Sequence, residues 1–181
     1  VSANLAQILE DGNMKLLAYS FTAIFVFIST ASANYLNPLI SPEELYDRLG
    51  QAKPIILDIR GVAYTEGHIP GSISAPYAMF RGPKNNPGQL LDEDTLEQRF
   101  EALGLDFNRP IVIVSEGKSN SDFGAAARVY WTLKSSGFTD LAVLNGGKLG
   151  WEAAGQSIDK ISVKPNATEL RIVGKTVDIE P

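Results

Sequence analysis

The sequence predicts an α/β fold in which a parallel sheet lies between two layers of helices, a three-layer α/β/α arrangement. Three short apolar runs, Pro54–Ile59, Ile111–Val114 and Leu141–Leu144, are typical of strands buried on both faces. Segments with apolar residues at helical spacing alternate with these runs. Strands that alternate with helices run in the same direction, so the sheet is expected to be parallel.

Four helices are expected around this sheet. The first begins after Ser41, a good N-cap residue, and ends at Gly50. In parallel sheets, ligands bind beyond the carboxyl ends of the strands and against helix N-termini. That rule points to the segment between Val114 and Ala125 as the place of a site. The expected helices are Pro42–Leu49, Glu93–Ala102, Gly124–Ser136 and Lys148–Ala154.

Composition narrows the possible chemistry. The chain has 181 residues, a formal net charge of −5, no cysteine and one histidine, His68. The absence of cysteine excludes a disulfide framework, a thiolate zinc site and a cysteine nucleophile. A single histidine makes a polyhistidine metal site or a Ser-His-Asp triad hard to build, so neither a metal nor a cofactor is expected. The negative net charge and the absence of any run of Lys or Arg argue against a nucleic-acid partner.

The amino-terminal segment has the layout of a secretory signal peptide. Residues 14–33 combine a short cationic start, an apolar run and a small-residue cleavage site at Ala31-Ser32-Ala33. The apolar run is shorter than the roughly 20 residues of a membrane-spanning helix, which leaves an anchor or a buried helix as weaker alternatives. Residues 1–13 precede this signal, and Met14 is the expected start. We therefore expect an exported protein, located in the periplasm and free of the membrane after cleavage.

The remainder divides into a domain and a polar extension. Residues 34–158 hold all the expected strands and helices. Residues 159–181 lose that periodicity, and their polar composition is typical of a linker. We expect this linker to lead towards a further domain.

Two patterns near the expected site are incomplete as catalytic motifs. Gly117-Lys118-Ser119 follows a buried strand, but position 112 is valine where a phosphate-binding loop needs glycine. Ser115 also follows that strand, as in a nucleophile elbow, but Ile113 stands where that motif needs glycine. Nucleotide binding and serine hydrolysis are therefore weak alternatives.

Three polar residues near the first central strand have structural and functional interpretations. His68 lies in a turn bracketed by Gly67 and Gly71, where local hydrogen bonding is a more common role than that of ligand or base. Asp58 and Arg60 flank the end of a strand, and a structural ion pair is favoured over a catalytic carboxylate.

Two separated signatures together resemble those of the rhodanese domain. The first comprises Leu57–Arg60, Tyr64 and Gly67–Pro76, and the second comprises Leu144–Gly147 followed by Trp151 and Gly155. Between them, Ile111–Ser115 and Gly124–Trp131 match the strand and helix around the family's sulfur-carrying loop. The resemblance covers about residues 38–155 and implies a five-stranded parallel sheet. The signature residues with an implied structural role are Asp58, Arg60, His68, Gly71, Arg128, Gly146, Gly147 and Trp151.

The sequence departs from this family at the position that matters most. Active members carry a cysteine directly after the central strand, and here that position is Ser115. A serine hydroxyl is far less acidic than a thiol and cannot carry a persulfide. The following loop, Glu116–Phe123, is expected to be longer than the family's compact cradle, with acidic residues where an anionic substrate would lie. The loop residues compared with the active site are Ser115, Glu116, Gly117, Lys118, Ser119, Asn120, Ser121 and Asp122.

Rhodanese domains that lack the cysteine typically form the first half of tandem sulfurtransferases, and the Asp122–Trp131 stretch resembles those halves. The resemblance therefore implies a non-catalytic domain that packs against a catalytic second rhodanese domain of the same polypeptide. Residues Glu116–Asp122 and Arg81–Asn86 are the candidate wall of the shared cleft. Two alternatives remain: a free-standing binding module without chemistry, and a hydrolase that uses Ser115 or Asp58.

Overall fold

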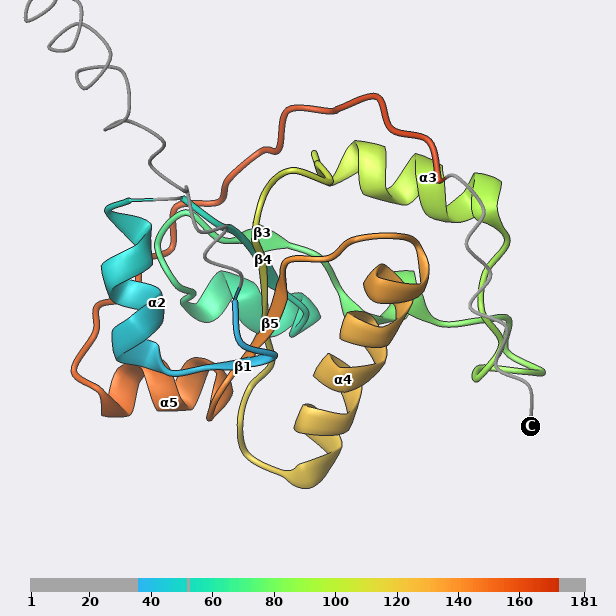
Figure 1. Cartoon of the computed structure of the whole chain (residues 1–181). Coiled ribbons are helices and arrows are strands. Elements are labelled where there is room, and N and C mark those ends of the chain that lie inside the picture. The colour runs from blue at the N-terminus through green and yellow to red at the C-terminus, as the bar shows by residue number, and fades with distance from the viewer. Residues whose placement is uncertain (1–35, 52, 173–181) are drawn as a thin grey trace, which may run out of the picture. The chain divides into compact units, whose positions relative to one another are not determined.

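A five-stranded parallel sheet with helices on both faces forms the centre of the protein (Figure 1). The computed structural model describes residues 36–51 and 53–172. The strand order is β1-β5-β4-β2-β3, and every neighbouring pair is parallel. The expected α/β/α fold is confirmed. The strands are β1 (Leu39–Ile40), β2 (Ile55–Asp58), β3 (Ile73–Ser74), β4 (Ile111–Val114) and β5 (Leu141–Leu144).

The three central strands are the three apolar runs of the sequence, and the two edge strands were not expected at their positions. Every residue of β2, β4 and β5 is buried. The edge strands β1 and β3 have only two residues each, which is too short to give a pattern.

Helices form along the rest of the chain with small shifts from the expected boundaries. Ser41 caps the first helix by accepting a hydrogen bond from the Glu44 amide at 3.1 Å. Two short 3-10 helices, between β2 and α3, have no counterpart among the expected elements. The helices are α2 (Pro42–Leu49), η1 (Gly61–Glu66), η2 (Tyr77–Phe80), α3 (Glu93–Ala102), α4 (Asn120–Ser135) and α5 (Gly147–Ala153).

Alternate residues of each central strand enter separate cores, because successive side chains point to opposite faces of a sheet. In β2, Ile55 and Leu57 pack with apolar residues of α3 and α4. Ile56 faces the other way and packs with Leu45 of α2 and Trp151 of α5. The sheet is therefore covered by α3 and α4 on one face and by α2 and α5 on the other.

The polar extension after the last helix packs against the domain. Leu170 and Ile172 are buried in the core that contains α3, and the amide of Ile172 donates to Glu97 of that helix at 2.7 Å. A linker expected from polar composition thus contacts the domain from residue 159 to 172, because two apolar side chains in it complete that core. Residues 1–13 and the expected signal peptide at 14–33 lie outside the described residues.

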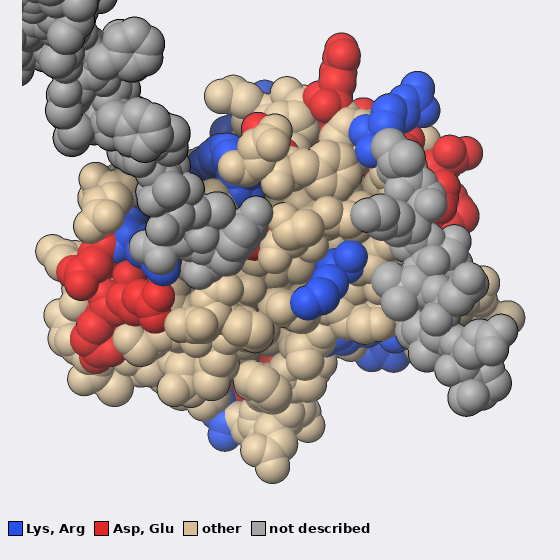
Figure 2. Space-filling view, viewed as in Figure 1, with Lys and Arg blue, Asp and Glu red and all other residues tan. Residues whose placement is uncertain are grey.

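Charged side chains on the visible face do not form a continuous basic patch. Figure 2 shows acidic side chains gathered over α2, whose first turn carries Glu43 and Glu44, and scattered basic ones elsewhere. No helix formed by the described residues has the length and apolar character needed to cross a bilayer.

Candidate functional site

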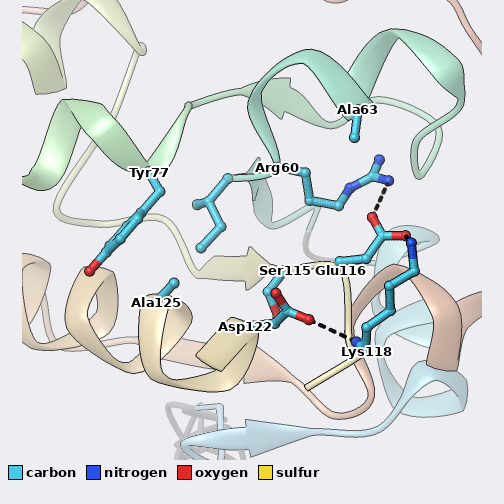
Figure 3. A pocket seen from close by; sticks show the side chains of 9 residues that line it. Arg60, Ala63, Tyr77, Ser115, Glu116, Lys118, Asp122 and Ala125 are labelled. Carbon is cyan, nitrogen blue, oxygen red and sulfur yellow. Dashed lines mark hydrogen bonds and ion pairs between the residues drawn. The ribbon is translucent and has the colours of Figure 1, made fainter. Parts of the chain in front are cut away.

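A hollow of about 400 Å³ opens at the carboxyl ends of β2 and β4 (Figure 3). Residues that follow β2 form one side of it, and residues that follow β4 form the other. Its place agrees with the rule that ligands of parallel sheets bind beyond the carboxyl ends of the strands. The lining residues are Ile59, Arg60, Ala63, Tyr77, Ser115, Glu116, Lys118, Asp122 and Ala125.

Ser115 lies in this hollow, directly after β4, and is 4% exposed. Its carbonyl oxygen accepts a hydrogen bond from the amide of Lys148 in α5 at 2.8 Å. The sole histidine of the chain, His68, bonds to backbone carbonyls elsewhere, so it does not serve Ser115 as a base. The Ser115 hydroxyl therefore has no histidine beside it to act as its base.

The loop after Ser115 is shorter than expected. Helix α4 begins at Asn120 rather than at Gly124, so the expected loop Glu116–Phe123 is wrong beyond Ser119. The physical reason is a capping box: the Ser119 side chain accepts from the Asp122 amide, and the Asp122 side chain accepts from the Ser119 amide.

The Asp122 carboxylate occupies the backbone donors at the start of α4. Its Oδ2 accepts hydrogen bonds from the amides of Lys118 and Ser119, both at 2.9 Å. Amides at a helix N-terminus are the groups that stabilise a bound anion or a thiolate. In this chain an internal carboxylate already fills that role.

Arg60 joins the two sides of the hollow. Its guanidinium donates to both carboxylate oxygens of Asp58, at 2.7–3.0 Å, and to Glu116 Oε2 at 3.1 Å. It also donates to the carbonyl oxygen of Gly67 at 2.7 Å. The Arg60 side chain is 4% exposed and that of Asp58 is fully buried. The geometry is that of a structural ion pair that extends to the site loop.

These contacts set the charge of the site. Burial opposes the charge of Arg60, but hydrogen bonds and charges from Asp58 and Glu116 outweigh it and raise the pKa of Arg60. Burial also favours the neutral form of Glu116, yet hydrogen bonds from Arg60 and Lys118 hold the pKa of that carboxyl below its usual value. Glu116 is therefore ionised and paired on both sides, with Lys118 Nζ at 3.2 Å.

A second hollow, of about 330 Å³, lies beside the same loop and is lined by Ser115, Asn120, Phe123 and the Asn145–Gly147 turn. Two glycines permit the close approach of these loops. A Cβ on Gly117, which has φ +88°, would overlap the carbonyl oxygen of Gly146. A Cβ on Gly147, with φ +57°, would overlap the carbonyl oxygen of Ser115.

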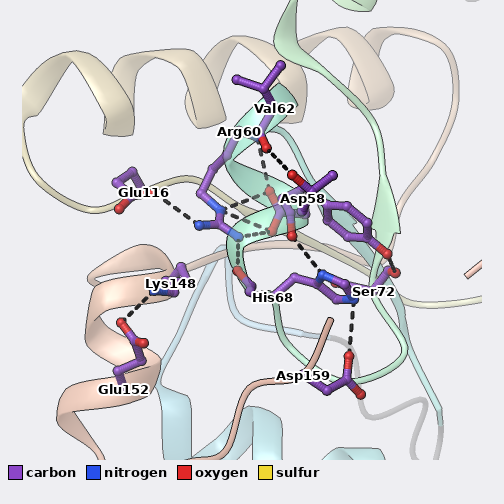
Figure 4. Close-up of polar contacts among 12 residues, drawn as sticks. Asp58, Arg60, Val62, His68, Ser72, Glu116, Lys148, Glu152 and Asp159 are labelled. Atoms are coloured by element: carbon purple, nitrogen blue, oxygen red, sulfur yellow. Dashed lines mark hydrogen bonds and ion pairs between the residues drawn. The ribbon is translucent and has the colours of Figure 1, made fainter. Parts of the chain in front are cut away.

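The other predicted residues lie away from the two hollows. Arg128 donates to the carbonyl oxygen of Gly88 at 2.7 Å. Trp151 is buried and donates to the Ser157 carbonyl at 2.8 Å. Gly71 has φ +80° in the turn before β3. His68 is fully buried and contacts the segment that follows α5 (Figure 4).

The second part of the candidate wall, Arg81–Asn86, is separate from the first. Arg81 and Lys84 line their own cavity of about 560 Å³ with residues of the loop before α3. One contact that relates it to the site is that of the Arg81 guanidinium, which lies over the ring of Tyr77 at 5.4 Å from its centroid. Tyr77 and Ala63 were missed from sequence, because the 3-10 helices that carry them have no apolar periodicity. Within residues 36–51 and 53–172, no cluster of His, Asp and Glu side chains could hold a metal ion.

Comparisons with known sequences agree on one family. Residues 41–154 match the rhodanese-like domain. A putative thiosulfate sulfurtransferase of Synechococcus elongatus is 33% identical over 135 residues, which cover 73% of this chain and 41% of that protein. A thiosulfate sulfurtransferase of Pseudomonas aeruginosa is 35% identical over 134 residues, which cover 67% of this chain and 44% of that protein. The chain thus spans less than half the length of both relatives.

Solved structures share the same fold. The crystal structure of SseA from Escherichia coli, a 3-mercaptopyruvate sulfotransferase with the rhodanese fold, superposes with a TM-score of 0.61 at 18% identity. The superposition covers 75% of this chain and 55% of that one. With the matched domain, the relatives and the fold in agreement, the chain belongs to the rhodanese-like family, as a domain without cysteine.

Proposed function

We propose that this chain is the non-catalytic rhodanese-like domain of an exported sulfurtransferase. Its role would be to pack against a catalytic second domain and to form one wall of the cleft between them. The chain covers only 41% and 44% of the two thiosulfate sulfurtransferases, which leaves room in such proteins for a second domain.

The observation that carries the proposal is the state of the site loop. Ser115 takes the place of the sulfur-carrying cysteine, and the amides of Lys118 and Ser119 are bonded to the Asp122 carboxylate. Sulfur transfer needs a thiolate held by free backbone donors. The loop has no thiol, and two of its amides are already bonded to a carboxylate, so in this proposal the domain contributes shape and surface rather than chemistry.

Two exposed apolar side chains at the site are suited to such packing. Val62, next to the hollow residue Ala63, is 88% exposed, and Phe123, which lines the second hollow, is 53% exposed. Contiguous exposed apolar patches mark interaction surfaces, and in this proposal Val62 and Phe123 belong to such a patch. We place the contact with the catalytic domain on this face.

Export is part of the proposal and is supported by sequence alone. Residues 14–33 have the order of features found in signal peptides. The periplasm is the compartment proposed.

The test compares this chain with the complete polypeptide encoded by its gene. We expect no sulfur transfer from thiosulfate to cyanide by this chain, and activity in the complete polypeptide. In the latter, Phe123→Glu should lower activity at least tenfold, because a charge replaces an apolar contact at the interface. Tyr46→Glu is the matched control, since Tyr46 is 55% exposed but lies on α2, and it should leave activity unchanged.

Two results would overturn the proposal. A gene without a second domain would leave a free-standing binding module, and equal activities of the Phe123→Glu and Tyr46→Glu variants would remove the packing face.

A further inference from the structure

The segment after α5 forms a strap, residues 159–172, that is fastened to the first signature of the domain. His68 and Asp159 exchange two backbone hydrogen bonds, each of 2.9 Å, as an isolated antiparallel bridge. In Figure 1 this segment leaves α5 and continues to α3. The bridge is therefore the first point at which the strap is held.

Two stacked rings hold the next part of the strap. The rings of Tyr64 and His68 are nearly parallel, with an interplanar angle of 5°, and their centroids are 3.7 Å apart. The Tyr64 hydroxyl accepts a hydrogen bond from the Val163 amide at 3.3 Å, and His68 Nε2 lies 3.1 Å from the carbonyl oxygen of Ile161. The two rings thus contact polar backbone groups two residues apart.

Both ring nitrogens of His68 face acceptors (Figure 4). Nδ1 lies 2.8 Å from the carbonyl oxygen of Tyr64. Nε2 lies near the Ile161 carbonyl and 3.2 Å from Oδ1 of Asp159. A neutral imidazole has one N–H and one lone pair, so one of its nitrogens would face oxygen lone pairs without a proton. Only the imidazolium can donate on both sides.

Burial of the ring opposes the charged form, and two neighbouring groups act against that penalty. The Asp159 carboxylate is a direct counter-ion, and the face of the Tyr64 ring is attractive to a cation. The Tyr64 hydroxyl itself donates to the Ser72 carbonyl at 2.7 Å, so it places no proton towards His68. Arg60 is the other charge close by; it reaches only the Gly67 carbonyl and is neutralised by Asp58 and Glu116.

We propose that His68 is a proton-dependent latch, whose imidazolium form fastens the strap to the domain. Docking of the strap fixes a proton on a ring that is neutral in water above about pH 6.5. The docked state therefore binds more protons than the released state, and docking weakens as pH rises, by at most about tenfold per pH unit.

The latch stands independently of the proposed second domain, because every contact in it lies within this chain. Its consequence is that pH sets how firmly residues 159–163 of the strap are held to the domain.

The test uses nitrogen-15 NMR on the whole chain, in which the one histidine gives unambiguous ring signals. At pH 6 both ring nitrogens should be protonated, while the bridge amides of His68 and Asp159 are protected from hydrogen exchange. After correction for the intrinsic exchange rate, the protection of these two amides should fall more than tenfold between pH 6 and pH 8. Protection in β4 should not change over this range.

A matched pair of variants separates the latch from general destabilisation. Asp159→Asn removes the counter-ion but keeps an acceptor, and it should lower the protection of the His68 amide at least threefold at pH 6. Asp47→Asn removes the same charge from an exposed position on α2 and should have no such effect. A neutral ring at pH 6 with the bridge intact, or equal protection at pH 6 and pH 8, would overturn the proposal. Equal effects of the two variants would do so as well.

Discussion

Replacement of Arg60 by leucine should destabilise the domain more than any substitution at an exposed ion pair. The Asp58 carboxylate is fully buried, and Arg60 supplies its charged partner at 2.7 Å. Without that partner, a charge would remain in the core next to β4. Removing one member of a buried pair typically costs about 3–5 kcal/mol, because the remaining charge is neither solvated nor compensated.

Two further contacts add to the expected loss, and a third moderates it. Arg60→Leu also removes the donors to Glu116 and to the carbonyl of Gly67, and Gly67 is buried. The backbone bond from the Arg60 amide to Asp58, of 3.0 Å, is retained and moderates the loss. We expect a total near 4 kcal/mol, which is a large fraction of the 5–15 kcal/mol typical of a domain.

Urea denaturation measures this difference directly. Arg171→Leu is the control, because Arg171 is 86% exposed, pairs with Glu97 at 3.4 Å and should cost below about 1 kcal/mol. The unfolding midpoint of Arg60→Leu should lie roughly 1–3 M urea below that of the control. A loss of less than about 1 kcal/mol in Arg60→Leu would refute the view that this pair holds the site together.

Three other predictions concern the site loop. Gly117→Ala should lower the free energy of unfolding by more than about 2 kcal/mol, as measured by thermal unfolding, because its Cβ would overlap Gly146. Gly124→Ala is the control: its Cβ would meet open space in α4, so this substitution should be neutral or stabilising. The lowered pKa of Glu116 means that its contribution to stability is present above about pH 4.3 and is lost as pH falls through that lowered pKa. Glu116→Gln should therefore be less stable than the parent at pH 6, and this difference should shrink as the pH is lowered. Ser115→Cys should stay inactive in sulfur transfer, and its thiol should alkylate with a midpoint at or above about pH 8.5; fast alkylation at pH 6 would contradict this.

The central part of the fold could be predicted because its signals are local. Strands β2, β4 and β5 are continuous apolar runs, and α2 is marked by the Ser41 cap and Gly50. The edge strands were not predicted, because a strand of two residues carries no periodicity. The start of α4 was predicted four residues too late, because Asn120 and Ser121 are weak helix formers. A Ser-x-x-Asp pattern at Ser119 was the signal that could have located that start.

A hollow lies at the loop that the sequence singled out, its role as a functional site stays a prediction, and the contacts within it were not predicted. The rule that ligands of parallel sheets bind beyond the carboxyl ends of the strands led to Ser115 and its loop. For the Asp58–Arg60 pair, a structural role was favoured over a catalytic one. The link from Arg60 to Glu116 joins residues 56 positions apart, and no local pattern encodes such a distance. The carboxylate that fills the loop, Asp122, was read as an added charge, because its role depends on where α4 begins.

The burial of Leu170 and Ile172 has a consequence for the order of events during synthesis. These two residues cover α3 but follow it by about 70 positions, as the bonds from their amides to Glu101 and Glu97 show. Contacts between such distant positions form late, since a long loop must close first. The domain therefore cannot complete its core until residue 172 has left the ribosome, and until then the part of the core that Leu170 and Ile172 cover stays open to chaperones.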